Sequence, residues 1–259
     1  VDIRALGTEL KELPPVLGNS KELTDALYQA ISAGQEPAKA VAFIGEAAKL
    51  AKAGLTDTFT TVDALTSVLN NYEGASLDAA TAADVLFLTV REGKTTVGEL
   101  SQAIGKVLPA AAALNIDFAD VGATLAEVTK RGLATSEAVT SLRSLFTAFR
   151  KETPGLKSAL KAVGLTAEEF RAMVAEPGGL VPALELLQEG AKKAGVTLQK
   201  ALGRVEAVTT FDILTRDAEA TKKAIANFRE ELSKGGIANE AFEKTVDSLR
   251  LSKEALRGA

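Results

Sequence analysis

The stretch that decides the fold of this chain runs from Ala82 to Arg143 and reads AADVLFLTVREGKTTVGELSQAIGKVLPAAAALNIDFADVGATLAEVTKRGLATSEAVTSLR. Its apolar residues recur mostly every three or four positions, with glycine, threonine and asparagine between the runs. This spacing is typical of amphipathic helices, and the intervening residues are typical helix caps and stops. The stretch offers no histidine or cysteine. It therefore predicts packed helices rather than a reaction centre.

The composition favours helices throughout the 259 residues. Apolar residues make up 46% of the chain, but aromatic residues only 5%, and tryptophan is absent. Alanine fills many apolar positions, whereas strands favour β-branched and aromatic residues. A chain of this length can bury a core without metal or disulfides, and its lack of cysteine fits a reducing compartment. We predict an all-α fold, a multi-helix bundle of stacked helical hairpins.

Several helix ends can be predicted from local sequence. Asn19, Asp117 and Thr135 are each placed to cap a following helix, because their side-chain oxygens can accept a hydrogen bond from the first turn. Thr166 and Glu169 have the spacing of a capping box. The sequence therefore predicts short helices with defined starts.

Proline and glycine mark the stops. The helix predicted over Asp2–Leu13 ends before Pro14, and the helix that Thr95 or Thr96 begins should end or kink at Pro109. These stops divide the central stretch into helices joined by short connectors.

Two four-residue segments resemble each other at predicted helix ends. Lys52-Ala53-Gly54-Leu55 and Lys130-Arg131-Gly132-Leu133 are each followed by apolar residues at helical spacing. The echo predicts two related hairpins in which glycine stops the first helix. Two imperfect copies are fewer than a true solenoid requires.

The last part of the chain changes character. We predict an alanine-rich helical core domain over residues 1–204 and a heptad-patterned helical hairpin or arm over residues 205–259. The heptad residues recur at alternating spacings of three and four. They are Phe211, Leu214, Ala218, Thr221, Ile225, Phe228 and Leu232.

A second stripe follows the glycines at positions 235 and 236 and contains Phe242, Val246, Leu249 and Leu256. The two stripes fit either a hairpin packed on itself or a coiled-coil arm that pairs with another copy, and the glycines between them favour the hairpin. We expect residues 205–259 to drive self-association into a homo-oligomer. The candidate residues are Phe211, Leu214, Ala218, Ile225, Phe228 and Leu232.

The chain offers little for catalysis or for binding a cofactor. Histidine is absent, which removes the usual general base and most zinc sites. No phosphate-binding loop is present, and no concentrated basic stripe favours direct nucleic-acid binding. We predict no catalytic residue, no cofactor and no metal. Asp84 is the acidic residue of most interest, because it sits among Ala82, Ala83, Val85 and Leu86. A helix cap or a buried partner explains it better than an active site.

Three ordered blocks resemble the core region of phage tail tape measure proteins. The family pattern is close to DVL, then TTVxELxxA[LI], then G[IL]xGSEAGTxLR. The corresponding blocks here are Asp84–Leu86, Thr95–Ile104 and Gly132–Arg143. Thr135 and Val139 replace two glycines of the family pattern. The resemblance covers roughly residues 23–211.

The resemblance implies a structural role. Tape measure proteins are long helical chains that occupy the lumen of the tail tube, set tail length during assembly in the host cytoplasm and leave ahead of the genome. Their expected partners are tail tube, tail tip and assembly chaperone proteins, and any contact with the host membrane would come from regions outside this segment. The chain starts at Val1 rather than methionine, so we expect it to be one segment of a longer protein.

Two other classes of protein fit the helical pattern. A helical-repeat adaptor would bind a partner in a groove and would expose a persistent apolar patch. A membrane-active protein would use the alanine-rich region Leu86–Leu114 as its inserting element. Glycine and proline interrupt that region at four positions, which disfavours the membrane reading.

Overall fold

The computed structural model describes the backbone of residues 3–258 and the side chains of residues 5–252 and 254. Within this part of the chain it contains sixteen α-helices, one 3-10 helix and no strand. The predicted all-α, multi-helix fold is therefore confirmed. The chain divides into two compact units: unit 1 is Val1–Leu88, Thr96–Gln102 and Lys234–Ala259, and unit 2 is Thr89–Thr95 and Ala103–Ser233. Helices α5 (Ala79–Glu92) and α6 (Val97–Ile104) contribute residues to both units.

Unit 1 is built around α3 (Pro37–Ala53), which packs against four other helices and a 3-10 turn. Pro37 stands at the first turn of α3, where its missing N–H costs nothing. Four alanines of α3 are fully buried, namely Ala40, Ala47, Ala48 and Ala51, so the neighbouring helices approach its backbone closely. The neighbours are α1 (Ile3–Glu12), η1 (Pro15–Leu17), α2 (Ser20–Ser32), α4 (Thr58–Asn71) and α16 (Ile237–Gly258).

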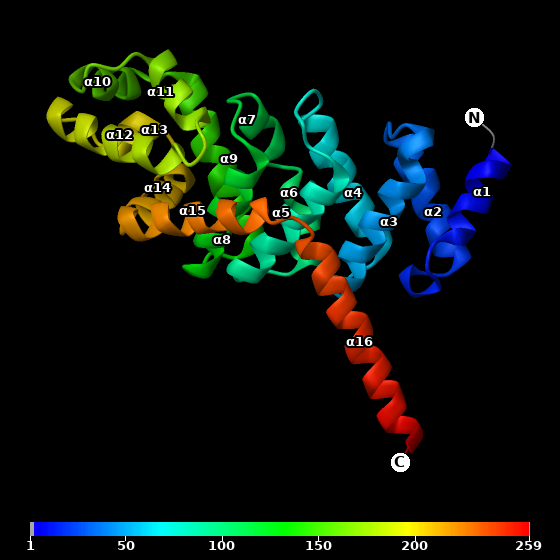
Figure 1. The fold of residues 1–259 in the computed structure, drawn as a ribbon. Helices are drawn as coiled ribbons and strands as arrows, with labels where there is room; N and C mark the ends of the chain where they lie inside the picture. The colour runs from blue at the N-terminus through cyan, green and yellow to red at the C-terminus, as the bar shows by residue number, and fades with distance from the viewer. Residues whose placement is uncertain (1–2, 259) are drawn as a thin grey trace. The chain divides into compact units, whose positions relative to one another are not determined.

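Unit 2 has α8 (Phe118–Lys130) at its centre, and every residue of α8 from Phe118 to Thr129 is buried. A helix without a solvated face must be covered on all sides. Figure 1 shows the helices that contact it, α9 (Thr135–Lys151), α14 (Val205–Thr215) and α15 (Ala218–Ser233). The short helix α7 (Leu108–Ala112) packs on α9.

Four further helices of unit 2 form a group that is continuous with α9. Phe149 of α9 meets Phe170 of α11 edge to face, with ring centroids 5.0 Å apart. The group consists of α10 (Pro154–Ala162), α11 (Ala167–Ala175), α12 (Leu180–Ala194) and α13 (Leu198–Leu202).

Most predicted caps are confirmed. The Asn19 side chain accepts the N–H of Glu22 at 3.0 Å, and Asp117 accepts the N–H of Ala119 at 3.2 Å. The capping box of Thr166 and Glu169 is present in full. Local hydrogen bonds of this kind depend on a few adjacent residues, so sequence alone can predict them.

The predicted cap at Thr135 is wrong. Helix α9 begins with Thr135 as its first helical residue, and its N-cap is Ala134, which offers no side-chain hydrogen bond. The Thr135 hydroxyl lies instead 2.7 Å from the hydroxyl of Thr95. The Thr135 hydroxyl therefore makes a tertiary hydrogen bond instead of the local capping bond that the sequence pattern predicts.

The predicted helix from Thr96 to Pro109 is shorter than expected. Thr96 does cap it, since its hydroxyl accepts the N–H of Glu99 at 3.2 Å. However, α6 already ends at Ile104, and Pro109 stands in the first turn of α7 instead of ending a helix. Proline is well suited to a first turn.

The heptad region forms two helices rather than one. Helices α14 and α15 are separated at Arg216-Asp217, and Asp217 accepts the N–H of Ala220 at the start of α15. Helix α14 packs mainly on α9, α15 mainly on α8, and α16 mainly on α3. The domain boundary at residues 204/205 stays a prediction. By these contacts, α14 and α15 belong with helices of unit 2, and α16 belongs with α3 of unit 1.

The cap of α5 leads to a prediction about pH. Asp78 accepts the Thr81 N–H at 2.8 Å, and hydrogen bonds from the backbone and side chain of Thr81 hold the pKa of its carboxyl below the usual value. Asp78→Ala should lower the free energy of unfolding by about 1 kcal/mol near pH 7.

Because the folded-state pKa is lowered, this stabilisation is present above the unfolded pKa of about 3.9 and is lost as pH falls through the folded value. Urea denaturation of both proteins across this pH range would test it. Asp63→Ala removes an exposed carboxylate within α4 and serves as the control. An equal effect of the two substitutions at all pH values would contradict the prediction.

Candidate functional site

Helices α8 and α15 are held together at the start of α8 by a partly buried charge cluster. Arg229 of α15 donates to Asp117 at 3.1 Å and to Asp120 at 2.9 Å. Asp120 is only 3% exposed, and its other carboxylate oxygen accepts the N–H of Gly178 at 2.8 Å. A single carboxylate therefore joins α8, α15 and the loop before α12.

Within this cluster, burial has the largest effect on the Asp120 carboxyl. Burial raises the pKa of the Asp120 carboxyl above its usual value, and the Gly178 N–H and the Arg229 guanidinium only partly oppose this. The carboxylate thus depends on its two donors, because a buried charge without partners is strongly unfavourable.

A second arginine fixes the other end of α8. Arg131, the C-cap residue of α8, donates to the carbonyl oxygen of Ile213 at 2.7 Å and to the Thr221 hydroxyl at 2.9 Å. It also pairs with Glu127 at 3.3 Å. Because Ile213 belongs to α14 and Thr221 to α15, Arg131 holds the corner between these two helices.

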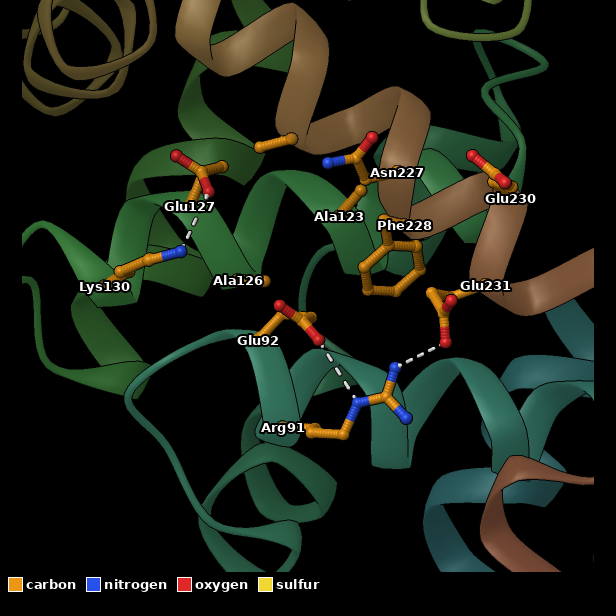
Figure 2. A pocket seen from close by; sticks show the side chains of 11 residues that line it. Arg91, Glu92, Ala123, Ala126, Glu127, Lys130, Asn227, Phe228, Glu230 and Glu231 are labelled. Carbon is orange, nitrogen blue, oxygen red and sulfur yellow. Dashed lines mark hydrogen bonds and ion pairs between the residues drawn. The ribbon is translucent and has the colours of Figure 1, made fainter.

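A groove of about 350 Å³ lies beside the α8–α15 pair, and Figure 2 shows its lining. The end of α5 supplies Arg91, which pairs with Glu92 at 3.2 Å and with Glu231 of α15 at 3.1 Å. Lys130 lies 3.9 Å from Glu127. The apolar part of the lining consists of Ala123, Ala126, Ala224 and Phe228.

Most charged residues of this groove form ion pairs, and the pair of Arg91 and Glu231 holds two helices together. The lining of the groove contains no serine, threonine, cysteine or histidine, and both of its cations lie within 4 Å of carboxylates. In the part of the chain that the structure describes, no three histidine, cysteine, aspartate or glutamate residues come together as metal ligands. Nor does any described helix combine the length and apolar character needed to cross a membrane.

Asp84 has the structural role that its sequence context predicted. It is 5% exposed, and its carboxylate accepts the N–H of Ala238 at 2.7 Å. Ala238 is in the first turn of α16, where free N–H groups and the helix dipole favour a negative charge. The carboxylate of Asp84 therefore caps α16 from α5, and both partners lie within unit 1.

The residues predicted for self-association are mostly buried within unit 2. Phe211 and Leu214 of α14 and Ile225 and Phe228 of α15 are all at most 3% exposed. Ala218 and Leu232 are partly exposed. The stripe therefore packs against helices of its own chain, and its part in oligomerisation stays a prediction.

Sequence patterns do not single out Arg131 or Arg229 as site residues, because most charged residues of a helical chain lie on solvated faces. One signal could have pointed to them. Asp117 and Asp120 stand at the beginning of a helix whose other residues are mostly apolar. Carboxylates in such a position require a cationic or N–H partner from elsewhere in the chain.

Comparison with known proteins identifies the family to which the chain belongs. The model of the family described as phage-related minor tail protein matches residues 2–201. The chain belongs to this family. The chain is also similar to a protein described as "Probable tape measure protein" from Clostridium phage phiCD119 (strain Clostridium difficile/United States/Govind/2006). The two are 30% identical over 285 aligned positions, which cover 100% of this chain and 30% of the relative.

Membership of this family confirms that the chain is a structural phage tail protein. The similarity to the curated relative confirms the predicted resemblance to tape measure proteins. It does not favour an adaptor or a membrane-active protein. The chain spans less than a third of the length of its curated relative. No solved structure matches it.

Proposed function

We propose that this chain is a segment of a tape measure protein. In this role it occupies the lumen of the tail tube, contributes to setting tail length during assembly in the host cytoplasm, and leaves the tube ahead of the genome. The observation that carries the proposal is the 30% identity, along the whole of this chain, to a relative described as a probable tape measure protein.

A helical chain can set the length of a tail because the α-helix rises by a constant amount per residue. Each helical residue adds 1.5 Å along the axis, so helices laid end to end convert residue number into length. Laid out in this way, 259 residues would span roughly 390 Å. A compact bundle of the same helices spans much less, and a length measurement can therefore distinguish the two states.

Residues 153–203 offer a sharp test, because the two ends of this segment touch. The Thr153 hydroxyl donates to the carbonyl oxygen of Ala201 at 2.6 Å. Removing the segment from a compact bundle would hardly change the distance between the flanking residues. Removing it from helices laid end to end would shorten the extended chain by roughly 75 Å. We expect phage tails that carry this deletion to be shorter by that amount, as measured by electron microscopy.

A duplication of residues 153–203 is the matched control and should lengthen tails by the same amount. Tails of unchanged length in both variants, with the altered protein incorporated, would contradict the ruler role of this segment.

Several partners belong to the same proposal. Tail tube, tail tip and assembly chaperone proteins would contact the chain, and copies of the chain would associate with one another. Contact with the host membrane would involve regions outside this segment.

We propose further that the segment is not an enzyme, since Asp84 serves as the cap of α16. Cell-wall hydrolysis by the purified chain that is lost in Asp84→Asn would contradict this.

A further inference from the structure

One connection between consecutive helices differs from all the others that the structure describes. Helices α14 and α15, labelled in Figure 1, are separated only by Arg216 and Asp217, here called the α14–α15 joint. Every other connector between consecutive helices in residues 3–258 contains a glycine, a proline or a residue with positive φ. Such residues end helices. The α14–α15 joint contains none of them, and Arg216 has helical backbone angles, with φ −55° and ψ −40°.

The sequence on both sides of the joint suits one uninterrupted helix. Residues 205–233 contain neither glycine nor proline. The heptad residues keep their spacing through the joint, since Ala218 follows Leu214 by four positions and precedes Thr221 by three. One continuous helix over this range would be about 43 Å long. Local sequence therefore does not explain why α14 ends at Thr215.

Two side chains replace backbone hydrogen bonds at the joint. In a continuous helix the carbonyl oxygen of Ile213 would accept the N–H of Asp217. The carbonyl oxygen of Arg216 would likewise accept the N–H of Ala220. In the structure, the Ile213 oxygen accepts the guanidinium of Arg131 at 2.7 Å. The Ala220 N–H donates instead to the Asp217 carboxylate at 3.1 Å. The end of α14 and the start of α15 thus each have a side-chain partner in place of a backbone partner.

Tertiary packing supplies one of these partners. Arg131 is the C-cap residue of α8, and it also donates to the Thr221 hydroxyl of α15 at 2.9 Å. Helix α14 packs mainly on α9, whereas α15 packs mainly on α8. All four helices belong to unit 2. The break therefore depends on contacts with α8 and α9, and these contacts exist only while unit 2 is compact.

We propose that the α14–α15 joint is a conformational switch. In the compact chain Arg131 and Asp217 hold the joint broken, and residues 205–233 become one continuous helix when the packing of unit 2 is released. The continuous form gains backbone hydrogen bonds across the joint, whereas the broken form gains the packing on α8 and α9. The use of this switch in the tail rests on the proposed length-setting role, which requires extended helices. The switch itself is a property of the chain and can be tested without phage.

Spin labels in place of Glu206 and Glu230 would measure the joint in the 259-residue chain. Both side chains are exposed, one on each side of the break. In a continuous helix the two positions would lie about 36 Å apart along the axis. By pulsed electron resonance we expect a shorter distance in the native chain. We expect about 36 Å in trifluoroethanol, because this alcohol expands the chain and preserves helices.

The Cα chemical shift of Asp217 reports the backbone at the joint directly. In trifluoroethanol it should move to a helical value, together with the shifts of Leu214 and Thr221 on either side. A non-helical Asp217 between two helical neighbours would overturn the switch. That result would leave the tail-length test of residues 153–203 unaffected. Tails of unchanged length in that test would, conversely, remove the length-setting role and leave the switch standing.

Ala218→Pro separates the two forms of the joint. Ala218 is the first residue of α15, where proline is well tolerated, because the N–H at this position has no acceptor within the helix. In a continuous helix the same proline would lose the hydrogen bond to Leu214 and clash with its carbonyl oxygen, which disfavours that form by more than about a hundredfold. We expect an unchanged or raised melting temperature, and an Asp217 shift that stays non-helical in trifluoroethanol. A helical Asp217 in this variant would contradict the proposal.

Arg131→Met tests the contact that holds the joint broken, and Lys130→Met is its matched control. Lys130 is the neighbouring cation and also lies near Glu127, but the hydrogen bonds to Ile213 and Thr221 come from Arg131. In native buffer, Arg131→Met should move the Asp217 shift toward the helical value, because the Ile213 oxygen is then free to accept the Asp217 N–H. Lys130→Met should leave the shift unchanged. Equal shifts in both variants would show that Arg131 does not hold the joint broken.

Discussion

Replacing Arg229 with methionine is expected to lower the free energy of unfolding by about 3–5 kcal/mol near pH 7. The substitution keeps an apolar stem of similar length but removes the guanidinium that lies 2.9 Å from Asp120. Asp120 is 3% exposed and would keep only the N–H of Gly178 as a donor. Breaking one side of a buried pair costs much more than the pair itself contributes, because the remaining charge stays desolvated.

The effect should depend on pH in a defined direction. Burial already raises the pKa of Asp120 in the folded protein, and loss of Arg229 should raise it further. For a carboxyl with a raised folded-state pKa, the folded state binds more protons, so stability falls as pH rises from the unfolded pKa to the folded one. The destabilisation in Arg229→Met should therefore shrink as the pH is lowered through the pKa of Asp120.

Denaturant unfolding of three variants would separate the causes. Asp120→Asn combined with Arg229→Met removes both charges and should be less destabilised than Arg229→Met alone. Arg91→Met breaks an ion pair that is 40% exposed on the arginine side, and it should cost less than about 1 kcal/mol. A loss of 1 kcal/mol or less in Arg229→Met that does not change with pH would show that the Asp120 carboxylate does not depend on Arg229.

Much of the fold could be predicted from sequence because local signals determine it. Helix α8 shows this well, since Asp117 caps it and an apolar run follows that no solvated helix would carry. The capping box at Thr166 and the start of α3 at Pro37 are equally local. In each case the hydrogen bonds and backbone angles involve residues within one helical turn.

The contacts that define the candidate site could not be predicted in the same way. Arg131 reaches Ile213 and Thr221, which are 82 and 90 residues away in sequence. The apparently continuous heptad pattern runs across the break between α14 and α15, because both helices bury apolar residues at helical spacing on either side of Asp217. Periodicity indicates which residues are buried, but not which helix covers them.

The echo between the ends of α3 and α8 shows that similar sequences can end a helix at different positions. Both segments contain glycine followed by leucine, and the sequence predicts glycine as the stop in each. Helix α8 ends at Lys130, so Arg131 is its C-cap and Gly132 is the left-handed residue. Helix α3 ends one position later in the echo, at Ala53, so Gly54 is its C-cap and Leu55 is the left-handed residue. A Cβ at Gly54 would lie 2.3 Å from Val97 Cγ2, so this glycine is required by a tertiary contact that no local pattern contains.

Gly190→Ala is expected to lower the free energy of unfolding by about 2–3 kcal/mol, although alanine is the better helix former. Gly190 is a buried residue of α12. A Cβ at this position would lie 2.2 Å from the carbonyl oxygen of Ala159 in α10, and 2.9 Å from its carbonyl carbon. Because these are backbone atoms, the clash can be relieved only by moving α10 and α12 apart. Thermal or denaturant unfolding would measure the loss.

Gly7→Ala is the matched control, because Gly7 also lies within a helix, α1, and a Cβ there would meet nothing within 4 Å. That substitution should stabilise the chain by about 0.5–1 kcal/mol through helix propensity alone. The two identical substitutions should thus have effects of opposite sign. If both stabilised the chain, the close crossing of α10 and α12 would not limit the size of residue 190, and the glycine would reflect only local backbone preference.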